Sequence, residues 1–255
     1  MSFNSRYTLF PVALIISALF LFTTLNQSDK SYRATQLPES KPRYIFVDLG
    51  ANRADSLEAF LQHQGAKFSH TFPRPEWASY DDAEIFLFEA NPVFNTHLVE
   101  AKERYAKQGI KVNIFPSTVV DVTDGIRTFF LDTVNDGHDF WGSSIYATHP
   151  DAVSSGSKGT NLTSINISTW LLRNTLPHDF VVVKMDIEGA EYEIVPHMAE
   201  MRTWVVMDHL LIEWHDATVT GGTPEEIDFR RKRAEAAVTK LKAEGVNLPA
   251  YDSSA

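Results

Sequence analysis

Short apolar runs alternate with amphipathic segments along most of the chain. The apolar runs are bounded by charged and turn-forming residues, which predicts buried strands at 44–48, 84–89, 110–115, 180–186 and 209–214. Between them, apolar residues at helical spacing predict helices at 54–64, 93–107, 190–201 and 224–243. Because strands and helices alternate, we expect an α/β fold with a mostly parallel sheet and helices on both of its faces.

Three segments depart from this alternation. Residues 67–82 contain two prolines and no clear period, which predicts a loop insertion. Residues 125–131 predict a further strand, paired with 162–167, and the long segment 132–159 between them is rich in Gly, Ser, His and Asp. A loop of that length in a compact domain is disordered or functional. Its aromatic HDFWGSS core favours a flap facing a substrate, with Trp141 stacking on it, whereas Trp170, Trp204 and Trp214 lie in apolar runs and are expected in the core.

The N-terminus has a pattern of its own. Residues 8–25 (TLFPVALIISALFLFTTL) are uncharged and almost wholly apolar. As a helix they would reach about 27 Å, close to the roughly 30 Å of a bilayer's hydrocarbon core. We therefore predict a tail and transmembrane signal anchor at 1–25, a polar tether at 26–42 and a folded domain at 43–255. A cleavable signal peptide is the main alternative, although no convincing cleavage site follows the run.

The charges that flank residues 8–25 give only a weak indication of how this segment is oriented in a membrane. We predict a single-pass membrane protein with the tail inside and the folded domain lumenal or extracytoplasmic. N-glycosylation triplets begin at Asn26, Asn161 and Asn166 and fit a lumenal domain, although Asn166 also lies in a predicted strand, where a structural role would explain it.

Composition narrows the function classes. Hydrophobic residues make up 44% of the 255-residue chain, which is enough for a sizeable core. The net charge of −10 argues against a nucleic-acid partner or binding to anionic membrane surfaces. The chain has no cysteine, which excludes disulfides, zinc-thiolate sites and a cysteine nucleophile.

Acidic residues gather where the run 180–183 ends. Asp186 and Glu188 are two residues apart, so they would point the same way on an extended strand, and Lys184 precedes them. Open α/β sheets bind ligands at this edge, where two acids can hold a hydroxyl, a metal ion or a proton. The competing interpretation is a strand end with solvated acids, followed by Glu191 and Glu193 in the first turn of a helix.

The ends of the first two predicted strands carry the features of a nucleoside-binding site. The first strand runs into VDLGANRAD, where Gly50 permits close backbone approach and Asp48 can accept a hydrogen bond from an amine or hydroxyl. The second strand ends in Glu89, followed by Asn91, and an acid there can accept hydrogen bonds from both hydroxyls of a ribose. Taken singly, a tight turn explains Gly50 and a helix N-terminus explains Glu89, but both occur at consecutive strand ends.

Four motifs together resemble the FkbM-type methyltransferase family, whose members use S-adenosylmethionine and mostly methylate hydroxyl oxygens. FVDLGAN (46–52), FEANP (88–92), KMDIEGAE (184–191) and LIEWHD (211–216) occur in the family's order. The resemblance implies a Rossmann-like class I methyltransferase sandwich of seven strands, one of them late and antiparallel. It also implies that Glu89 holds the ribose of S-adenosylmethionine and that the methionine end is lined by Asp48, Gly50, Ala51 and Asn52; we add Asn91 to the cofactor site.

The chain departs from the family in two places. Ala54 stands where the family commonly has a glycine, so its methyl group is expected to crowd the cofactor. After residue 243 there is room for one short strand only, at 246–251, so we expect an abbreviated C-terminal end of the sheet.

The chemistry implied by the resemblance needs a proton acceptor. Methyl transfer to oxygen is an in-line displacement, and a hydroxyl needs a base or a metal at the moment of attack. We predict His215 as the base because imidazole titrates near neutrality, with Asp186 and Glu188 next. Those acids, with Glu213 and Asp216, would also suit a magnesium ion, but we favour a site without metal.

The predicted function is therefore O-methylation of a glycan, a lipid or another small hydroxylated molecule. A membrane-anchored glycosyltransferase is one alternative, for which Asp186-x-Glu188 is a poor substitute for a metal-binding Asp-x-Asp motif. A catalytically degenerate, cofactor-binding interaction module is the other.

Overall fold

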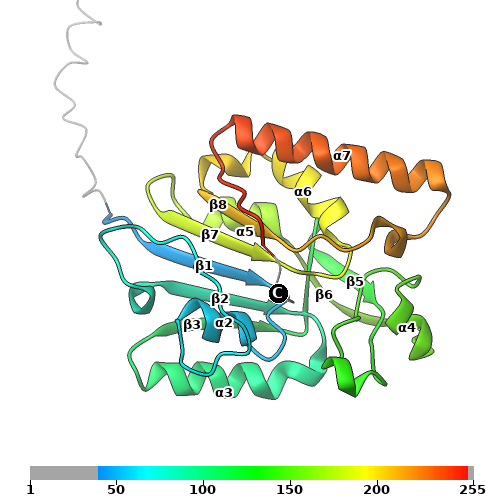
Figure 1. The fold of residues 1–255 in the computed structure, drawn as a ribbon, viewed down its shortest axis with the longest axis horizontal. Coiled ribbons are helices and arrows are strands. Elements are labelled where there is room, and N and C mark those ends of the chain that lie inside the picture. Colours follow the sequence, from blue (N-terminus) through cyan, green and yellow to red (C-terminus); the bar gives the residue numbers. More distant parts are fainter. Residues whose placement is uncertain (1–39, 252–255) are drawn as a thin grey trace, which may run out of the picture. The chain divides into compact units, whose positions relative to one another are not determined.

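Five parallel strands form the central sheet. The computed structural model describes residues 40–251, and the described residues from Pro42 onward belong to one compact unit. The strands lie in the order β3-β2-β1-β7-β8 and every neighbouring pair is parallel (Figure 1). Their bounds are β1 (Tyr44–Leu49), β2 (Glu84–Glu89), β3 (Lys111–Pro116), β7 (Phe180–Met185) and β8 (His209–Ile212).

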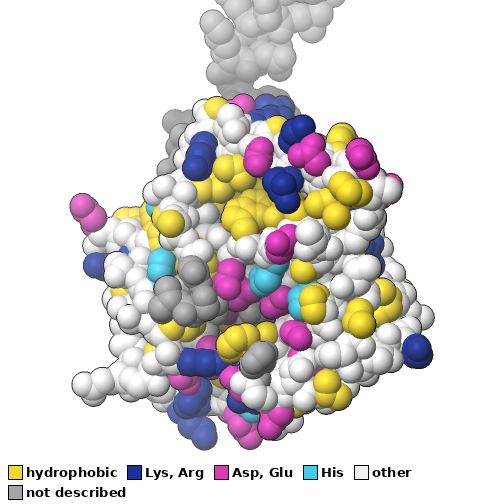
Figure 2. Space-filling model, turned by 45° about the vertical axis from the view of Figure 1, so that its right-hand side comes forward, with side chains coloured by type: hydrophobic (Ala, Val, Ile, Leu, Met, Phe, Trp, Pro, Cys, Tyr) yellow, Lys and Arg dark blue, Asp and Glu magenta, His cyan; other side chains and the backbone are white. Residues whose placement is uncertain are grey.

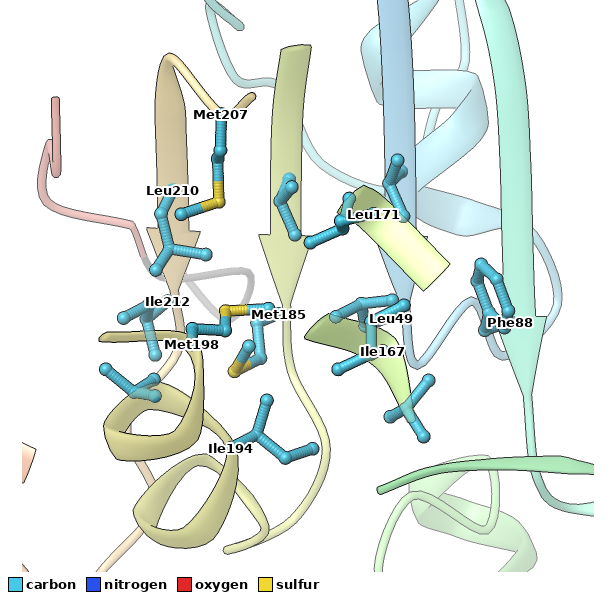
Figure 3. Packing of buried hydrophobic residues seen from close by; sticks show 14 of the residues in the cluster. Leu49, Phe88, Ile167, Leu171, Met185, Ile194, Met198, Met207, Leu210 and Ile212 are labelled. Atoms are coloured by element: carbon cyan, nitrogen blue, oxygen red, sulfur yellow. The ribbon is translucent and has the colours of Figure 1, made fainter. Parts of the chain in front are cut away.

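Helices cover both faces because the strands are apolar on both sides. On β1, Ile45, Val47 and Leu49 pack into one hydrophobic cluster, whereas Tyr44 and Phe46 pack into another. The first cluster includes side chains of α5 (Ile167–Asn174), α6 (Glu191–Glu200) and α7 (Pro224–Ala243), and Figure 3 shows part of it. The second includes side chains of α2 (Asp55–Phe60) and α3 (Asn95–Ala106). The predicted α/β sandwich with helices on both faces is confirmed.

A small second sheet follows the first three strands. It consists of β4 (Thr118–Asp121), β5 (Gly125–Phe129) and β6 (Thr160–Asn166) in the order β4-β6-β5. β5 and β6 pair, as predicted for 125–131 and 162–167, and the structure shows that they are antiparallel. The Asn166 side chain caps α5 by accepting from Thr169 N at 2.9 Å, and it donates to the Val122 carbonyl at 2.8 Å. Asn166 therefore has the structural role that its position suggested.

Short elements fill the connections. α4 (Pro150–Ser154) lies in the long segment 132–159. The 3₁₀ turns are η2 (Tyr80–Asp82), η3 (Pro92–Phe94), η4 (Asp136–His138), η5 (Thr203–Val205) and η6 (Ala217–Thr220). Residues 67–82 are otherwise without regular structure, which confirms the predicted loop insertion.

The C-terminal end of the sheet is abbreviated, as predicted. α7 has the predicted bounds, because Thr223 and Glu226 form a capping box around Pro224 at its start. After it, the chain adds only isolated parallel bridges to β8, at Asn247 and Ala250. Among the described residues, the central sheet has no antiparallel strand, so the seven-stranded sheet implied by the resemblance is not observed.

The predicted membrane anchor, 8–25, and the tether as far as residue 39 lie outside the described residues and stay predictions. None of the helices found between residues 40 and 251 has both the length and the apolar character needed to cross a bilayer.

The tips of β1 and β7 are in backbone contact. Asp186 N donates to the Leu49 carbonyl at 3.0 Å, and Gly50 follows with a φ of 86°. A Cβ at position 50 would lie 1.9 Å from the Asp186 carbonyl oxygen. From the sequence we expected Gly50 to permit close approach of a ligand. In the structure, Gly50 permits close approach between the ends of β1 and β7.

We expect Gly50→Ala to lower the free energy of unfolding by about 3–5 kcal/mol, because positive-φ strain adds to a clash with backbone that cannot turn away. Gly65→Ala is the matched control: Gly65 has a φ of 102°, but no described atom comes within 4 Å of the place that a Cβ would take. This control should cost only about 1 kcal/mol. Urea unfolding of both variants measures the difference, and equal losses would contradict the contact argument.

Candidate functional site

A cavity of 350 Å³ lies at the carboxyl ends of the parallel strands. Loops after β1, β2, β7 and β8 line it, together with residues from the segment 132–159. Figure 2 shows acidic and histidine side chains gathered near the middle of the molecular face that it presents. Of the predicted site residues, seven line the cavity: Gly50, Ala51, Asn52, Glu89, Asn91, Asp186 and Glu188. Asp48 and His215 are not part of this lining, although each contacts a residue that is.

Glu89 joins the tips of β1 and β2. Its Oε2 accepts from the Asn52 backbone N at 2.7 Å, and its Oε1 accepts from the Asn91 backbone N at 2.6 Å. The side chain is buried. Burial raises the pKa of Glu89 to about 7, although the two backbone donors oppose the shift. Each oxygen has a further lone pair, so the carboxylate can accept hydrogen bonds from a ligand while it stays in place.

The turn after β1 is shaped by left-handed backbone. Asn52 has a φ of 48° and Ala54 a φ of 71°. Gly50 N and Ala51 N both donate to the Phe88 carbonyl at 3.0 Å, which ties this turn to β2. Ala54 is fully buried in the apolar cluster around Phe60 and takes no part in the cavity lining. Its methyl group therefore packs in the core and does not line the cavity, and the expected crowding of a cofactor stays a prediction.

A buried ion network supports the cavity from behind. Lys184 and Asp48 are almost fully inaccessible, and their charged atoms lie 3.1 Å apart. Lys184 Nζ also donates to the Gly50 carbonyl at 2.8 Å and lies 3.4 Å from Asp186 Oδ2. Burial lowers the pKa of Lys184, but Asp48 and Asp186 outweigh it and raise the pKa. Asp48 thus contacts Lys184 in the interior, whereas the sequence placed it against a ligand.

Asp186, Glu188 and His215 meet at one side of the cavity; we call them the carboxylate–histidine cluster. His215 Nε2 lies 3.2 Å from Glu188 Oε2 and 3.7 Å from Asp186 Oδ1. β7 ends at Met185, so the two acids are not on an extended strand as predicted; they lie in the turn that follows it. Glu188 has a φ of 53°, an uncommon conformation for a residue with a side chain, and this turn brings it to His215.

His215 is held from its other side by a buried acid. Its Nδ1 lies 3.0 Å from Oε1 of Glu191, which is fully buried. Burial lowers the pKa of His215, but the hydrogen bonds to Glu188 and Glu191 outweigh it and raise the pKa to about 11. In this state His215 carries a proton on each ring nitrogen and lacks the lone pair that a base needs. The cluster's two carboxylates retain theirs.

A histidine that the sequence analysis did not select completes the surroundings of Glu188. His149 is buried, and its Nε2 lies 3.1 Å from Glu188 Oε2. Its Nδ1 accepts from the Asp151 backbone N at 3.3 Å, which leaves the proton on Nε2. Burial raises the pKa of Glu188, but His149 and His215 outweigh it and lower the pKa to about 2. No period or motif marks His149, and only the folded loop brings it here.

The segment 132–159, which we call the flap, closes one side of the cavity. Phe140, Trp141, Ser143 and Ile145 line the cavity from it. Asn91 Nδ2 donates to Ser143 Oγ at 3.0 Å, so the flap is joined to the loop after β2. The position of Trp141 fits the predicted stacking role, which stays a prediction.

The outer part of the flap is fastened by charge. Asp139 lies 2.7 Å from both Arg53 Nη1 and Lys67 Nζ, and Lys67 sits 4.7 Å over the ring of Trp141. Asp139 and Phe140 both have positive φ values, of 53° and 55°. The ion pairs therefore hold a strained turn beside the cavity.

Three residues of the segment 213–216, which follows β8, lie in different surroundings. Glu213 lines the cavity. Asp216 is exposed and accepts from Thr218 N at 2.8 Å, so it caps η6 and lies outside the cluster. Trp214 is 41% exposed, and its ring lies 5.2 Å from the ring of Tyr192 in a tilted arrangement. The prediction that Trp214 belongs to the core was wrong, because the strand ends before it.

We expect Lys184→Met to cost about 3–5 kcal/mol of unfolding free energy, because it leaves the carboxylate of Asp48 buried without a counter-charge. The double variant Asp48→Asn, Lys184→Met should recover part of that loss, since it removes both charges. The free energies of unfolding of the wild type and of the single and double variants, measured in urea, form a double-mutant cycle. A double variant no more stable than Lys184→Met would show that the ion pair is not what stabilises this region.

Comparison with known proteins identifies the family. Residues 48–232 match the family model described as Methyltransferase FkbM domain. No curated protein and no solved structure matches the chain. The match spans the turn after β1, the tip of β2 and the carboxylate–histidine cluster, which are the features that build the cavity. The chain belongs to the FkbM methyltransferase family.

Proposed function

We propose that the protein is an S-adenosylmethionine-dependent O-methyltransferase that acts on a hydroxyl group of a glycan, a lipid or another small molecule. The observation that carries the proposal is that Glu89 lines the same cavity as Asp186 and Glu188, the two acids of the carboxylate–histidine cluster, in a chain of a methyltransferase family. One end of the cavity has the groups for a nucleoside, and the other has the groups for proton transfer.

The residues present fit S-adenosylmethionine. Glu89 offers a buried carboxylate with free lone pairs to the ribose hydroxyls, and the turn at 50–52 offers backbone to the amino-acid end. Phe94, Val119 and Val120 give the cavity an apolar side that suits an adenine ring. When bound, the cofactor supplies a methyl group on a sulfonium, which is electrophilic without help from the protein.

The protein's own contribution is alignment and removal of a proton. Transfer of the methyl group from a bound cofactor to an acceptor oxygen would require the acceptor hydroxyl to lose its proton. We assign proton acceptance to the carboxylates of the cluster, Asp186 and Glu188, because they face the cavity. His215 and His149 orient Glu188 through their Nε2 atoms. Trp141 and Phe140 of the flap exclude water and contact the acceptor.

We expect Glu89→Gln to weaken the binding of S-adenosylhomocysteine by about 10- to 100-fold, because hydrogen bonds to a charged acceptor are worth about 1.5–3 kcal/mol each. Glu84→Gln, at the opposite end of β2, is the matched control. Binding to the wild type should strengthen as the pH rises from about 6 to 8 and then level off, because ribose hydroxyls donate to the ionised form of a group whose pKa is about 7. Glu89→Gln should abolish this dependence.

Calorimetry of the full-length protein at several pH values measures both effects, with UDP as a control nucleotide that should not bind. Absence of S-adenosylhomocysteine binding to the wild type, or equal affinity for UDP, would contradict the proposal.

We expect Asp186→Asn to lower methyl transfer by about 10²- to 10⁴-fold while the affinity for S-adenosylhomocysteine stays within about twofold. Asp216→Asn is the control, because asparagine keeps the cap on η6 and the residue lies outside the cavity. The measurement is incorporation of label from methyl-labelled S-adenosylmethionine into a panel of glycans and lipids. A similar rate loss in both variants would remove Asp186 from the reaction.

A further inference from the structure

The carboxylate–histidine cluster has the composition and spacing of a metal centre. One ligand atom from each of Asp186, Glu188 and His215 can be chosen so that the three lie within 4.8 Å of one another. In an octahedral site with bonds of about 2.1 Å, adjacent ligand atoms are about 3.0 Å apart and opposite ones about 4.2 Å. The distances from His215 Nε2, 3.2 Å to Glu188 and 3.7 Å to Asp186, need only a small contraction to reach this geometry.

Each member of the cluster is also held by a residue outside it. His215 Nδ1 contacts Glu191, Glu188 Oε2 contacts His149, and Asp186 Oδ2 contacts Lys184. Histidines that bind metals almost always donate their second ring N–H to a carboxylate, carbonyl or water, and metal-bound carboxylates are hydrogen-bonded in turn. The contact between Nδ1 and Glu191 leaves Nε2 as the ligand atom, and Nε2 is the atom that faces both acids.

Glu191 supplies an independent observation. Its side chain is fully inaccessible, and its Oε1 accepts from the Ile187 backbone N at 2.9 Å as well as contacting His215. Its Oε2 is buried and has no hydrogen-bond partner among the described residues. The four carboxylates here, of Asp48, Asp186, Glu188 and Glu191, outnumber the two cationic groups, Lys184 and a protonated His215, so an excess of negative charge remains. A divalent cation would offset that excess.

We propose that Asp186, Glu188 and His215 bind one divalent metal ion, although the sequence led us to favour a site without metal. On binding, the Nε2 proton of His215 leaves to solvent and Nε2 forms the metal bond. One imidazole nitrogen with two carboxylate oxygens is a mixed set of ligands that suits Mn²⁺ and similar divalent ions of the first transition-metal row. The consequence for catalysis rests on the proposed function: an ion here would bind the acceptor oxygen and lower the pKa of its hydroxyl.

The test uses full-length protein stripped of metals and titrated with Mn²⁺ alone, followed by calorimetry and by the Mn²⁺ paramagnetic resonance signal. We expect one Mn²⁺ per chain. Glu191→Gln should weaken Mn²⁺ binding by about 10- to 100-fold as an outer partner, and Glu188→Gln should weaken it further as a ligand. Glu193→Gln, on the same helix and outside the cluster, should leave the affinity unchanged.

Failure of the wild type to take up Mn²⁺, or uptake that Glu188→Gln leaves unchanged, would overturn the proposal. Titration of the same samples with S-adenosylhomocysteine reports on the Glu89 end of the cavity, so loss of the metal site and loss of the proposed function are separate results. Should Glu188→Gln fail to show a cooperative thermal transition, His215→Gln replaces it with the same expectation and the same overturning result.

Discussion

The buried ammonium group of Lys184 fixes the base of the site. It contacts Asp48 within β1, the Gly50 carbonyl directly after β1, and Asp186 directly after β7. These two strands are neighbours at the centre of the sheet. At the same place the backbone after β1 and the backbone after β7 approach so closely that no Cβ fits at position 50. A charge buried this deeply is tolerated only when partners surround it, so the positions of the two strand ends are set together.

The two ends of the cavity are held by different physical means. Backbone N–H groups of Asn52 and Asn91 hold Glu89, and they are neutral donors fixed by the turns that carry them. Charged or titratable side chains hold the carboxylate–histidine cluster, with Glu191 and His149 on its outer side. The first end is therefore set by the fold of the strand tips. The second is held by groups that can gain or lose protons, which suits the proton transfer that we propose.

The sequence predicted what depends on the strands and missed what depends on the loops. Gly50, Glu89 and Asp186 could be placed because carboxyl ends of parallel strands share one edge of the sheet. The depth of Asp48 could not be predicted, because a strand-end acid looks the same in sequence whether it faces a cavity or a buried lysine. Trp214 was assigned to the core because an apolar run does not show where its strand ends.

The flap shows why such residues escape a sequence-based prediction. His149 has no periodic neighbours, yet it is one of two histidines on Glu188 Oε2, and Ser144 Oγ donates to the Glu188 carbonyl at 2.7 Å. Glu188 itself has the strained backbone that such contacts must stabilise. Two of these three contacts come from the flap, and the third comes from His215 in the loop after β8. The flap and the central sheet therefore build the cluster together, and the position of Glu188 depends on contacts from the flap.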